Sequence, residues 1–253
     1  MTSFIDAETS PYFDLEILKR PQLRLNNYAG LRGPYFSMFQ PPPWMNKNLR
    51  VGVVRAFKNP RYENDRAESN KMIQVAVDSF YEAVDYNGSR HRIYNASDFD
   101  TVINLPSQFS ANTRICEYFN DFWPYKFPIL DNVLSKKLSQ EVQFDIKKIL
   151  REDCTKTFSL VDDYINGFKN TYWNKPFEIK HIKPTLRRYV HNFLQLEPWC
   201  NKYLSQFIKG KNILLVDDTI GEGITLKEAS DVLNQFSPRT ITSFTVMRDY
   251  RRS

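Results

Sequence analysis

One segment near the C-terminus limits what this chain can fold into more than any other. Residues 213–226 have the sequence ILLVDDTIGEGITL, in which four apolar residues precede two adjacent aspartates and a loop with two glycines. A short apolar run that ends in polar residues is typical of a buried strand. The apolar residues at 226–236 then recur at helical spacing. The segment therefore predicts a buried strand at 213–216, a polar loop at 217–223 and a helix.

The same segment and the residues after it predict a parallel sheet. Thr225 and Glu228 have the T-x-x-E spacing of a capping box, which indicates where the helix begins. Ser237 and Pro238 end the helix, and the residues at 240–247 predict another strand. Strand, loop, helix and strand in this order form a βαβ unit, whose ligands bind at the carboxyl ends of its parallel strands. We therefore expect an α/β fold with a twisted, mainly parallel sheet and helices on both faces.

The remaining sequence predicts an extension, an insertion and further elements around this unit. Residues 1–45 predict irregular chain, and residues 138–208 predict a mainly helical insertion that breaks near Pro176. We expect 1–97 to be an N-terminal extension and 98–253 to be the core that carries the insertion. The other predicted elements are a strand at 49–57, a helix at 66–84, a turn at 87–88, a short strand at 91–94, a buried strand at 101–105, a helix at 110–123 and a strand at 127–134.

Composition excludes several classes of protein. The chain has 253 residues, of which 42% are hydrophobic and 25% charged, so it can bury a core and is not composed like a disordered protein. It has no apolar stretch of membrane-spanning length and no start like a secretory signal, so we expect a cytoplasmic protein without a membrane partner. Three cysteines are too few for a disulfide scaffold or a zinc cluster. The net charge of +6 fits an anionic partner or a solvated basic surface.

The polar loop has the chemistry of a site for a phosphorylated sugar. The N-terminus of a helix presents free backbone N–H groups that favour an anion, above all a phosphate. Gly221 and Gly223 allow the backbone to approach that anion closely, and Thr225 can donate a hydroxyl to it. Asp217 and Asp218 would repel a phosphate, but they suit sugar hydroxyls or a Mg²⁺ held through water.

This stretch resembles the motif of type I phosphoribosyltransferases that binds phosphoribosyl pyrophosphate (PRPP), and the layout is most similar to competence-associated phosphoribosyltransferase-like proteins. The resemblance implies a Mg²⁺-dependent transfer of phosphoribose from PRPP to a nucleobase-like acceptor, with release of pyrophosphate. Asp217 and Asp218 would be the catalytic residues, which hold the ribose hydroxyls and bind Mg²⁺ through water. The residues implied for the 5-phosphate are Thr219, Ile220, Gly221, Glu222, Gly223, Ile224 and Thr225.

The resemblance also assigns a pyrophosphate site to an earlier part of the chain. The strand at 101–105 would end in a loop that binds pyrophosphate, and the strand at 127–134 would lead into a mobile catalytic loop. The alternative is an ordinary strand–helix turn and a pair of solvated lysines. The residues implied for pyrophosphate are Ser107, Gln108, Ser110, Lys136 and Lys137.

Glu222 departs from the family pattern, which has small hydroxyl residues before the glycine. A carboxylate at about 4 Å from a phosphate is repelled by about 4 kcal/mol at an effective dielectric of about 20. We therefore expect Glu222 to point away from the phosphate, to bind another group, or to mark an altered site. The family's hood, which selects the nucleobase, would come from 1–97 or from 138–208, because no room for it remains after Tyr250.

Two other classes of function stay open. A non-catalytic protein of the same fold could bind a phosphoribosyl ligand or a nucleotide as a signal, and Glu222 favours that reading. A nucleic-acid-associated protein, for example one that modifies a base, fits the net charge of +6 and the 15% of aromatic residues. The basic cluster at 183–188 fits phosphate, nucleic acid or a solvated helix end. A homodimer is compatible with the resemblance.

Overall fold

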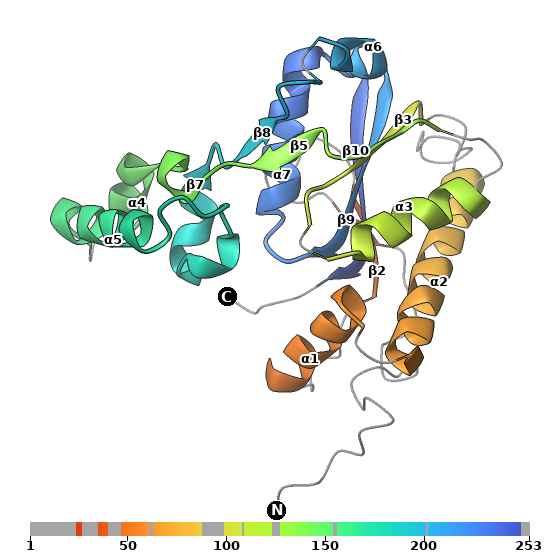
Figure 1. The fold of residues 1–253 in the computed structure, drawn as a ribbon, viewed down its shortest axis with the longest axis horizontal. Helices are drawn as coiled ribbons and strands as arrows, with labels where there is room; N and C mark the ends of the chain where they lie inside the picture. Colours follow the sequence, from red (N-terminus) through yellow and green to blue (C-terminus); the bar gives the residue numbers. More distant parts are fainter. Residues whose placement is uncertain are drawn as a thin grey trace, which may run out of the picture.

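The centre of the molecule is a six-stranded sheet with the strand order β1-β2-β10-β9-β3-β4 (Figure 1). The computed structural model describes residues 24–26, 35–39, 47–60, 63–87, 99–107, 109–122, 127–153, 156–200 and 202–248. Every pair of neighbouring strands is parallel except β1 with β2. The predicted mainly parallel α/β sheet is thus confirmed. Its strands are β1 (Arg24–Asn26), β2 (Tyr35–Phe39), β3 (Thr101–Asn104), β4 (Ile129–Leu130), β9 (Asn212–Ile220) and β10 (Thr240–Arg248).

Strand β9 lies in the middle of the sheet and positions the acidic pair. Its apolar side chains alternate between the two faces, as the pleat requires. Leu214 and Val216 pack into one core cluster, and Ile213 and Leu215 pack into the other. The strand continues past Val216 to Ile220 because its pairing with β10 continues. The prediction that the polar loop begins at Asp217 was therefore wrong, since both aspartates belong to the strand.

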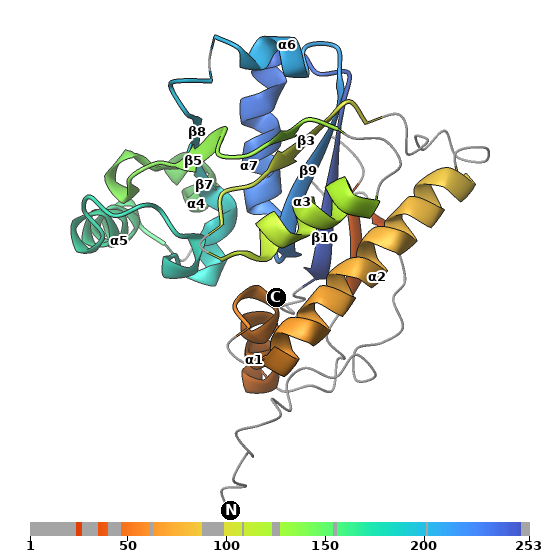
Figure 2. The same ribbon diagram turned by 45° about the vertical axis from the view of Figure 1, so that its right-hand side comes forward.

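Helices α1 (Lys47–Lys58), α2 (Glu63–Asn87) and α3 (Ala111–Phe122) pack into the core cluster on one face (Figure 2). The ring of Phe80 forms an aromatic cluster there, with ring centroids 4.8 Å from Phe36 and 5.0 Å from Phe244. The helices predicted at 66–84 and 110–123 are confirmed. The strand predicted at 49–57 was wrong, because this segment is α1. Val53 and Phe57 are both buried, and this i, i+4 spacing matches a helix face.

Helix α7 (Ile224–Leu233) covers the opposite face and is followed by the short 3₁₀ helix η5 (Asn234–Phe236). The predicted capping box was wrong. The N-cap is Gly223, at φ +68°, and the capping position makes no side-chain hydrogen bond. Glu228 instead accepts a hydrogen bond from the backbone N–H of Phe193, with an N–O distance of 2.9 Å. The carboxylate of Glu228 therefore joins α7 to the backbone at Phe193. The strand predicted at 240–247 is confirmed as β10.

Residues 133–200 contain a lobe beside the sheet that is less helical than predicted. Strand β5 (Leu134–Lys136) pairs with β8 (Leu194–Leu196), and β6 (Gln143–Phe144) pairs with β7 (Val190–His191), both antiparallel. The strand predicted at 127–134 is interrupted, because β4 ends at Leu130 and the chain turns at Asn132, whose φ is 55°. The helices of this lobe are α4 (Ile146–Glu152), α5 (Phe158–Thr171) and the 3₁₀ helices η2 (Ser139–Glu141), η3 (Ile179–His181) and η4 (Pro184–Tyr189). Helix α6 (Leu204–Ile208) follows the lobe and precedes β9.

The helices within the described ranges include none with the length and apolar character needed to span a membrane. Asn87 of the turn predicted at 87–88 is the last residue of α2, whereas Gly88 and the short strand predicted at 91–94 lie outside the described residues.

Candidate functional site

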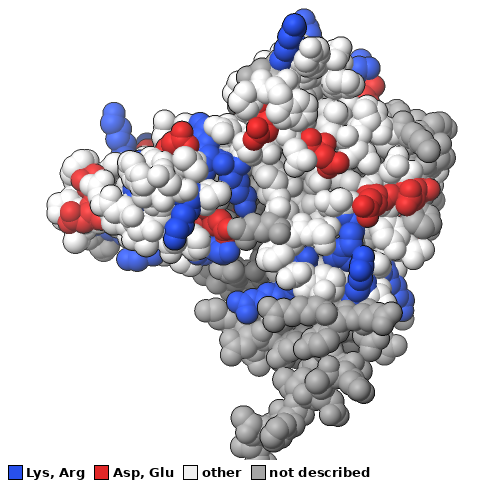
Figure 3. All heavy atoms as spheres, in the orientation of Figure 1, with Lys and Arg blue, Asp and Glu red and all other residues white. Residues whose placement is uncertain are grey.

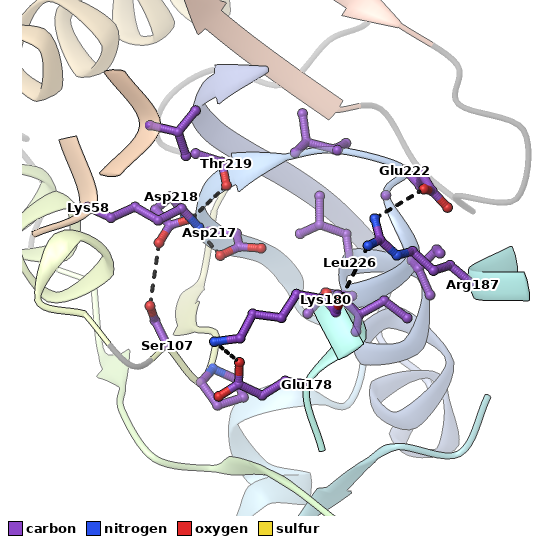
Figure 4. Close-up of a pocket in the computed structure, with 18 of the residues that line it drawn as sticks. Lys58, Ser107, Glu178, Lys180, Arg187, Asp217, Asp218, Thr219, Glu222 and Leu226 are labelled. Carbon is purple, nitrogen blue, oxygen red and sulfur yellow. Dashed lines mark hydrogen bonds and ion pairs between the residues drawn. The ribbon is translucent and has the colours of Figure 1, made fainter. Parts of the chain in front are cut away.

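A cavity of about 500 Å³ opens at the carboxyl end of β9 (Figure 4). Its walls come from the last turns of α1, the turn after β3, the β9–α7 loop and the lobe. In Figure 3, basic side chains border the hollow between the lobe and the rest of the molecule. The volume lies in the range of small-molecule sites. The polar and charged residues of its lining are Lys58, Ser107, Lys136, Glu178, Lys180, Arg187, Asp217, Asp218, Thr219, Glu222 and Thr225.

Asp218 is the more strongly paired of the two aspartates. Its side chain is only 1% exposed, and its Oδ1 lies 2.5 Å from the Nζ of Lys58. It accepts hydrogen bonds from the hydroxyls of Thr219, at 2.9 Å, and Ser107, at 3.4 Å. A buried carboxylate of this kind is stable only with such partners. Asp218 therefore joins α1 and the turn after β3 to the sheet.

Asp217 has donors of a different kind. Its Oδ1 accepts hydrogen bonds from the amide Nδ2 of Asn112, at 3.2 Å, and from the backbone N–H of Asp218, at 2.9 Å. Burial raises the pKa of Asp217 to about 6, and the charge of Asp218 acts in the same direction. Lys58 and the two hydrogen bonds oppose this rise. Asp217 is thus a carboxylate whose charge would be favoured by a cation or by hydroxyl donors at the site.

Lys58 was missed in the sequence because the segment around it was predicted to be a strand. It is the last residue of α1, and the preceding carbonyl, that of Phe57, is held firmly. This carbonyl accepts hydrogen bonds from the Oγ of Ser69, at 3.0 Å, and from the guanidinium of Arg114, at 2.9 Å. The Lys58 ammonium is therefore presented to Asp218 from a fixed helix end. No local sequence signal indicates this contact, because it is purely tertiary.

The turn into α7 has the backbone geometry of an anion site. Gly223 is buried at φ +68°, a conformation that glycine adopts without strain, and α7 begins at the next residue. The first turn of α7 contains no acidic residue, and Thr225 in that turn lines the cavity. Gly221 also lines the cavity, and a Cβ added there would meet no atom within 4 Å. Of the two loop glycines, Gly223 alone has a backbone conformation that requires glycine.

Only some of the residues predicted to bind pyrophosphate line the cavity. Ser107 and Lys136 line the cavity, and burial lowers the pKa of Lys136 while Glu178 and Asp217 oppose that shift. Ser110 is exposed and is not part of the cavity lining. Lys137 also lies outside the lining, where its Nζ contacts the Oδ1 of Asn192 at 2.5 Å. Gln108 lies outside the described residues.

The basic cluster at 183–188, for which phosphate, nucleic acid or a solvated helix end was predicted, contains a residue of the cavity wall that the sequence did not single out. Arg187 is buried and lines the cavity, whereas Arg188 is 63% exposed and contacts Glu152 on the lobe. The two differ because consecutive residues of the 3₁₀ helix η4 point in different directions. Arg187 Nη1 lies 3.7 Å from Oε1 of Glu222, so the carboxylate of Glu222 faces an arginine of the lobe. One of the three outcomes expected for Glu222, contact with another group, is the one observed.

Residues 185–253 match the family model described as phosphoribosyl transferase domain. Over these residues, about a quarter of the chain, the sequence is similar to phosphoribosyltransferases. The match begins within η4 and includes β9, the β9–α7 loop, α7 and β10, so it covers both aspartates and Arg187. The resemblance inferred from the sequence is thereby confirmed at the level of the family. No match to the chain was found among curated proteins.

The acidic pair at this cavity fits a loosely held Mg²⁺. Among the described residues, no group of three or more His, Cys, Asp or Glu side chains could form a metal cage. Mg²⁺ does not need one, because it keeps several waters and is bound through one or two carboxylates together with substrate oxygens. Asp217 and Asp218 at the cavity wall provide such a pair. The donor set thus suits Mg²⁺ that arrives with a phosphorylated substrate.

Proposed function

We propose that this protein transfers phosphoribose from PRPP to a nucleobase-like acceptor and releases pyrophosphate. One observation carries the proposal: the acidic pair, the glycine turn at the start of α7, Ser107 and Lys136 all line one cavity. The family match supports phosphoribosyl transfer in general. PRPP carries a 5-phosphate, two ribose hydroxyls and a pyrophosphate, and this cavity offers a matching group for each.

The proposed roles follow from the position of each group. Residues 219–225 would bind the 5-phosphate through backbone N–H groups and the Thr225 hydroxyl. Asp217 and Asp218 would accept hydrogen bonds from the ribose hydroxyls and hold Mg²⁺, which supplies positive charge to the leaving pyrophosphate. Ser107 and Lys136 would bind that pyrophosphate from the other side of the cavity.

The reaction needs little covalent chemistry from the protein. The bond between the anomeric carbon and the pyrophosphate oxygen breaks, and its electron pair leaves with pyrophosphate. A nitrogen of the acceptor forms the new bond to the anomeric carbon, and its proton passes to solvent. The anomeric carbon becomes positively charged between these events, so nearby carboxylates stabilise it. Positioning and charge stabilisation by Asp217, Asp218 and Lys136 would supply the catalysis.

Titration calorimetry with PRPP and Mg²⁺ tests this proposal. The native protein should bind at micromolar concentration, and Asp217→Asn/Asp218→Asn should lose that binding. The matched control is Asp162→Asn/Asp163→Asn, because these adjacent aspartates lie on α5, outside the cavity lining. Native protein that is folded and does not bind PRPP would overturn the proposal. If it binds, a screen of nucleobases for pyrophosphate release identifies the acceptor.

A second candidate function, binding without turnover, is favoured by the contact between Lys58 and Asp218. This ion pair already neutralises one of the two carboxylates that the transfer reaction would use. PRPP binding that depends on Asp217 and Asp218, with no pyrophosphate release for any base, would identify a ligand-binding protein with this fold.

A further inference from the structure

The β9–α7 loop, where the proposed function places the phosphate of the ligand, itself contains a carboxylate. Glu222 lies between Gly221 and Gly223, directly before α7. Its side chain is 37% exposed, and it lines the same cavity as the loop. A carboxylate beside the phosphate would weaken binding by repulsion. A phosphate site in this loop therefore needs a compensating positive charge close to Glu222.

Arg187 provides that charge from the lobe. Its side chain is 11% exposed, and its Nη1 lies 3.7 Å from Oε1 of Glu222. The guanidinium is anchored at its other nitrogens, because Nε donates to the carbonyl of Ile182, at 3.0 Å, and Nη2 to that of Lys180, at 3.5 Å. Arg187 is therefore a buried arginine that is fixed by the backbone of the lobe and directed toward the loop (Figure 4).

The separation of Arg187 from Glu222 distinguishes this pair from a simple structural ion pair. A distance of 3.7 Å is longer than a hydrogen bond, so Glu222 does not hold the guanidinium in a bidentate pair. Arginine has the planar donor geometry that matches phosphate oxygens, and a guanidinium that is already anchored loses little freedom when it binds. A phosphate in the loop would offer Arg187 more acceptors and more charge than Glu222 does.

We infer that Arg187 binds the phosphate group of the ligand in the β9–α7 loop and that Glu222 competes with this phosphate for the guanidinium. The inference rests on the proposed function only in taking this loop as the phosphate site. It makes the lobe part of that site, and it assigns to Glu222 the role of limiting the affinity. The ligand class is a phosphate monoester on a sugar.

Calorimetric titration with ribose 5-phosphate tests the inference, because this probe lacks pyrophosphate and needs no turnover. Arg187→Gln should weaken binding by roughly tenfold or more, since a charged hydrogen-bond donor is lost. Arg187→Lys should recover only part of that loss. Glu222→Gln should tighten binding several-fold, and the gain should shrink in the Arg187→Gln background. The control is Arg188→Gln, because Arg188 is exposed on the lobe.

The outcomes separate this inference from the proposed function. If native protein binds ribose 5-phosphate and Arg187→Gln binds it as well as Arg188→Gln does, the inference is overturned while the proposed function stands. If Glu222→Gln weakens binding, Glu222 is a ligand rather than a competitor, and the inference is again overturned. If binding depends on Arg187 but PRPP is never turned over, the inference holds and the transferase proposal fails. Should Arg187→Gln fail to fold, Glu222→Gln gives the same test at a partly exposed position.

Discussion

Asp217 and Asp218 are neighbours in the sequence, but the fold gives them different electrostatic surroundings. Asp218 lies against the ammonium of Lys58 and two hydroxyls. Asp217 accepts hydrogen bonds from uncharged N–H donors, and burial raises its pKa. Because Asp217 lacks full compensation for its charge, it is the residue of the pair that a substrate hydroxyl or a cation would stabilise most. A ligand that stabilises the charge of Asp217 would therefore gain binding free energy at this site.

Asp217→Asn should make the protein more stable at pH 7.5 in the absence of Mg²⁺. The pKa of Asp217 is raised in the folded state from 3.8 to about 6, so protonation stabilises the fold. That stabilisation is complete below the unfolded pKa and is lost as the pH rises through the folded pKa. The variant should therefore gain about 1–2 kcal/mol at pH 7.5 and about half as much at pH 5. Urea unfolding at both pH values measures this, with Asp162→Asn as control. A loss of stability at pH 7.5 would contradict it.

The two glycines of the β9–α7 loop should respond differently to alanine. Gly223→Ala should destabilise the fold by about 1–2 kcal/mol, because alanine is strained at a φ of +68°. Gly221→Ala should change stability by less than about 0.5 kcal/mol, because its Cβ meets no atom within 4 Å. Since Gly221 lines the cavity, this variant should still weaken ribose 5-phosphate binding. Urea unfolding and calorimetry of both variants decide this, and equal losses of stability would refute the distinction.

At the scale of the elements, the end of α1 is attached to the sheet by one buried ion pair. Arg114 and Ser69 hold the carbonyl of Phe57, which fixes the position from which Lys58 reaches Asp218. Lys58→Met keeps the length of the side chain and removes its charge. It should destabilise the protein by about 1–3 kcal/mol, because Asp218 is then buried without a cation.

Mg²⁺ should restore part of this stability, since it can supply the missing positive charge. We therefore expect millimolar Mg²⁺ to raise the melting temperature of Lys58→Met more than that of native protein. The exposed ion pair of Lys227 with Asp231 gives the control, Lys227→Met, for which Mg²⁺ should have no special effect. An equal response of all three proteins would show that Lys58 does not compensate Asp218.

The sequence predicted those elements whose signals are local. Strand β9, helix α7 and strand β10 follow from local patterns of apolar and β-favouring residues, but β9 continues through the acidic pair to Ile220 because its pairing with β10 continues. Helix α1 was mistaken for a strand because its valines suggest β-structure, whereas burial of Val53 and Phe57 on one helix face decides the outcome. The capping box failed because Glu228 finds a partner in Phe193, which is distant in sequence. Lys58 could not be predicted, and Arg187 could not be distinguished from its basic neighbours, because the roles of both depend on contacts between distant segments.

At the scale of the whole molecule, the cavity brings together parts of the chain that are far apart in sequence. The end of α1, the turn after β3, the β9–α7 loop and the lobe each contribute a wall. The loop and the lobe share one apolar core cluster, whereas α1 packs into the other. A ligand in this cavity would therefore contact both halves of the core, which are otherwise joined mainly through the sheet.

Hydrogen–deuterium exchange should show this bridging directly. PRPP with Mg²⁺ should protect backbone amides in all four walls, and at about 100 times its Kd it should stabilise the fold by about 2.7 kcal/mol. Ribose 5-phosphate should protect the β9–α7 loop and η4 but leave the turn after β3 and β5 exchanging as before, because it lacks pyrophosphate. Asp217→Asn/Asp218→Asn should show neither pattern with PRPP. Protection by both ligands that is confined to the β9–α7 loop would mean that α1 and the lobe take no part in binding, and the four-walled site would have to be abandoned.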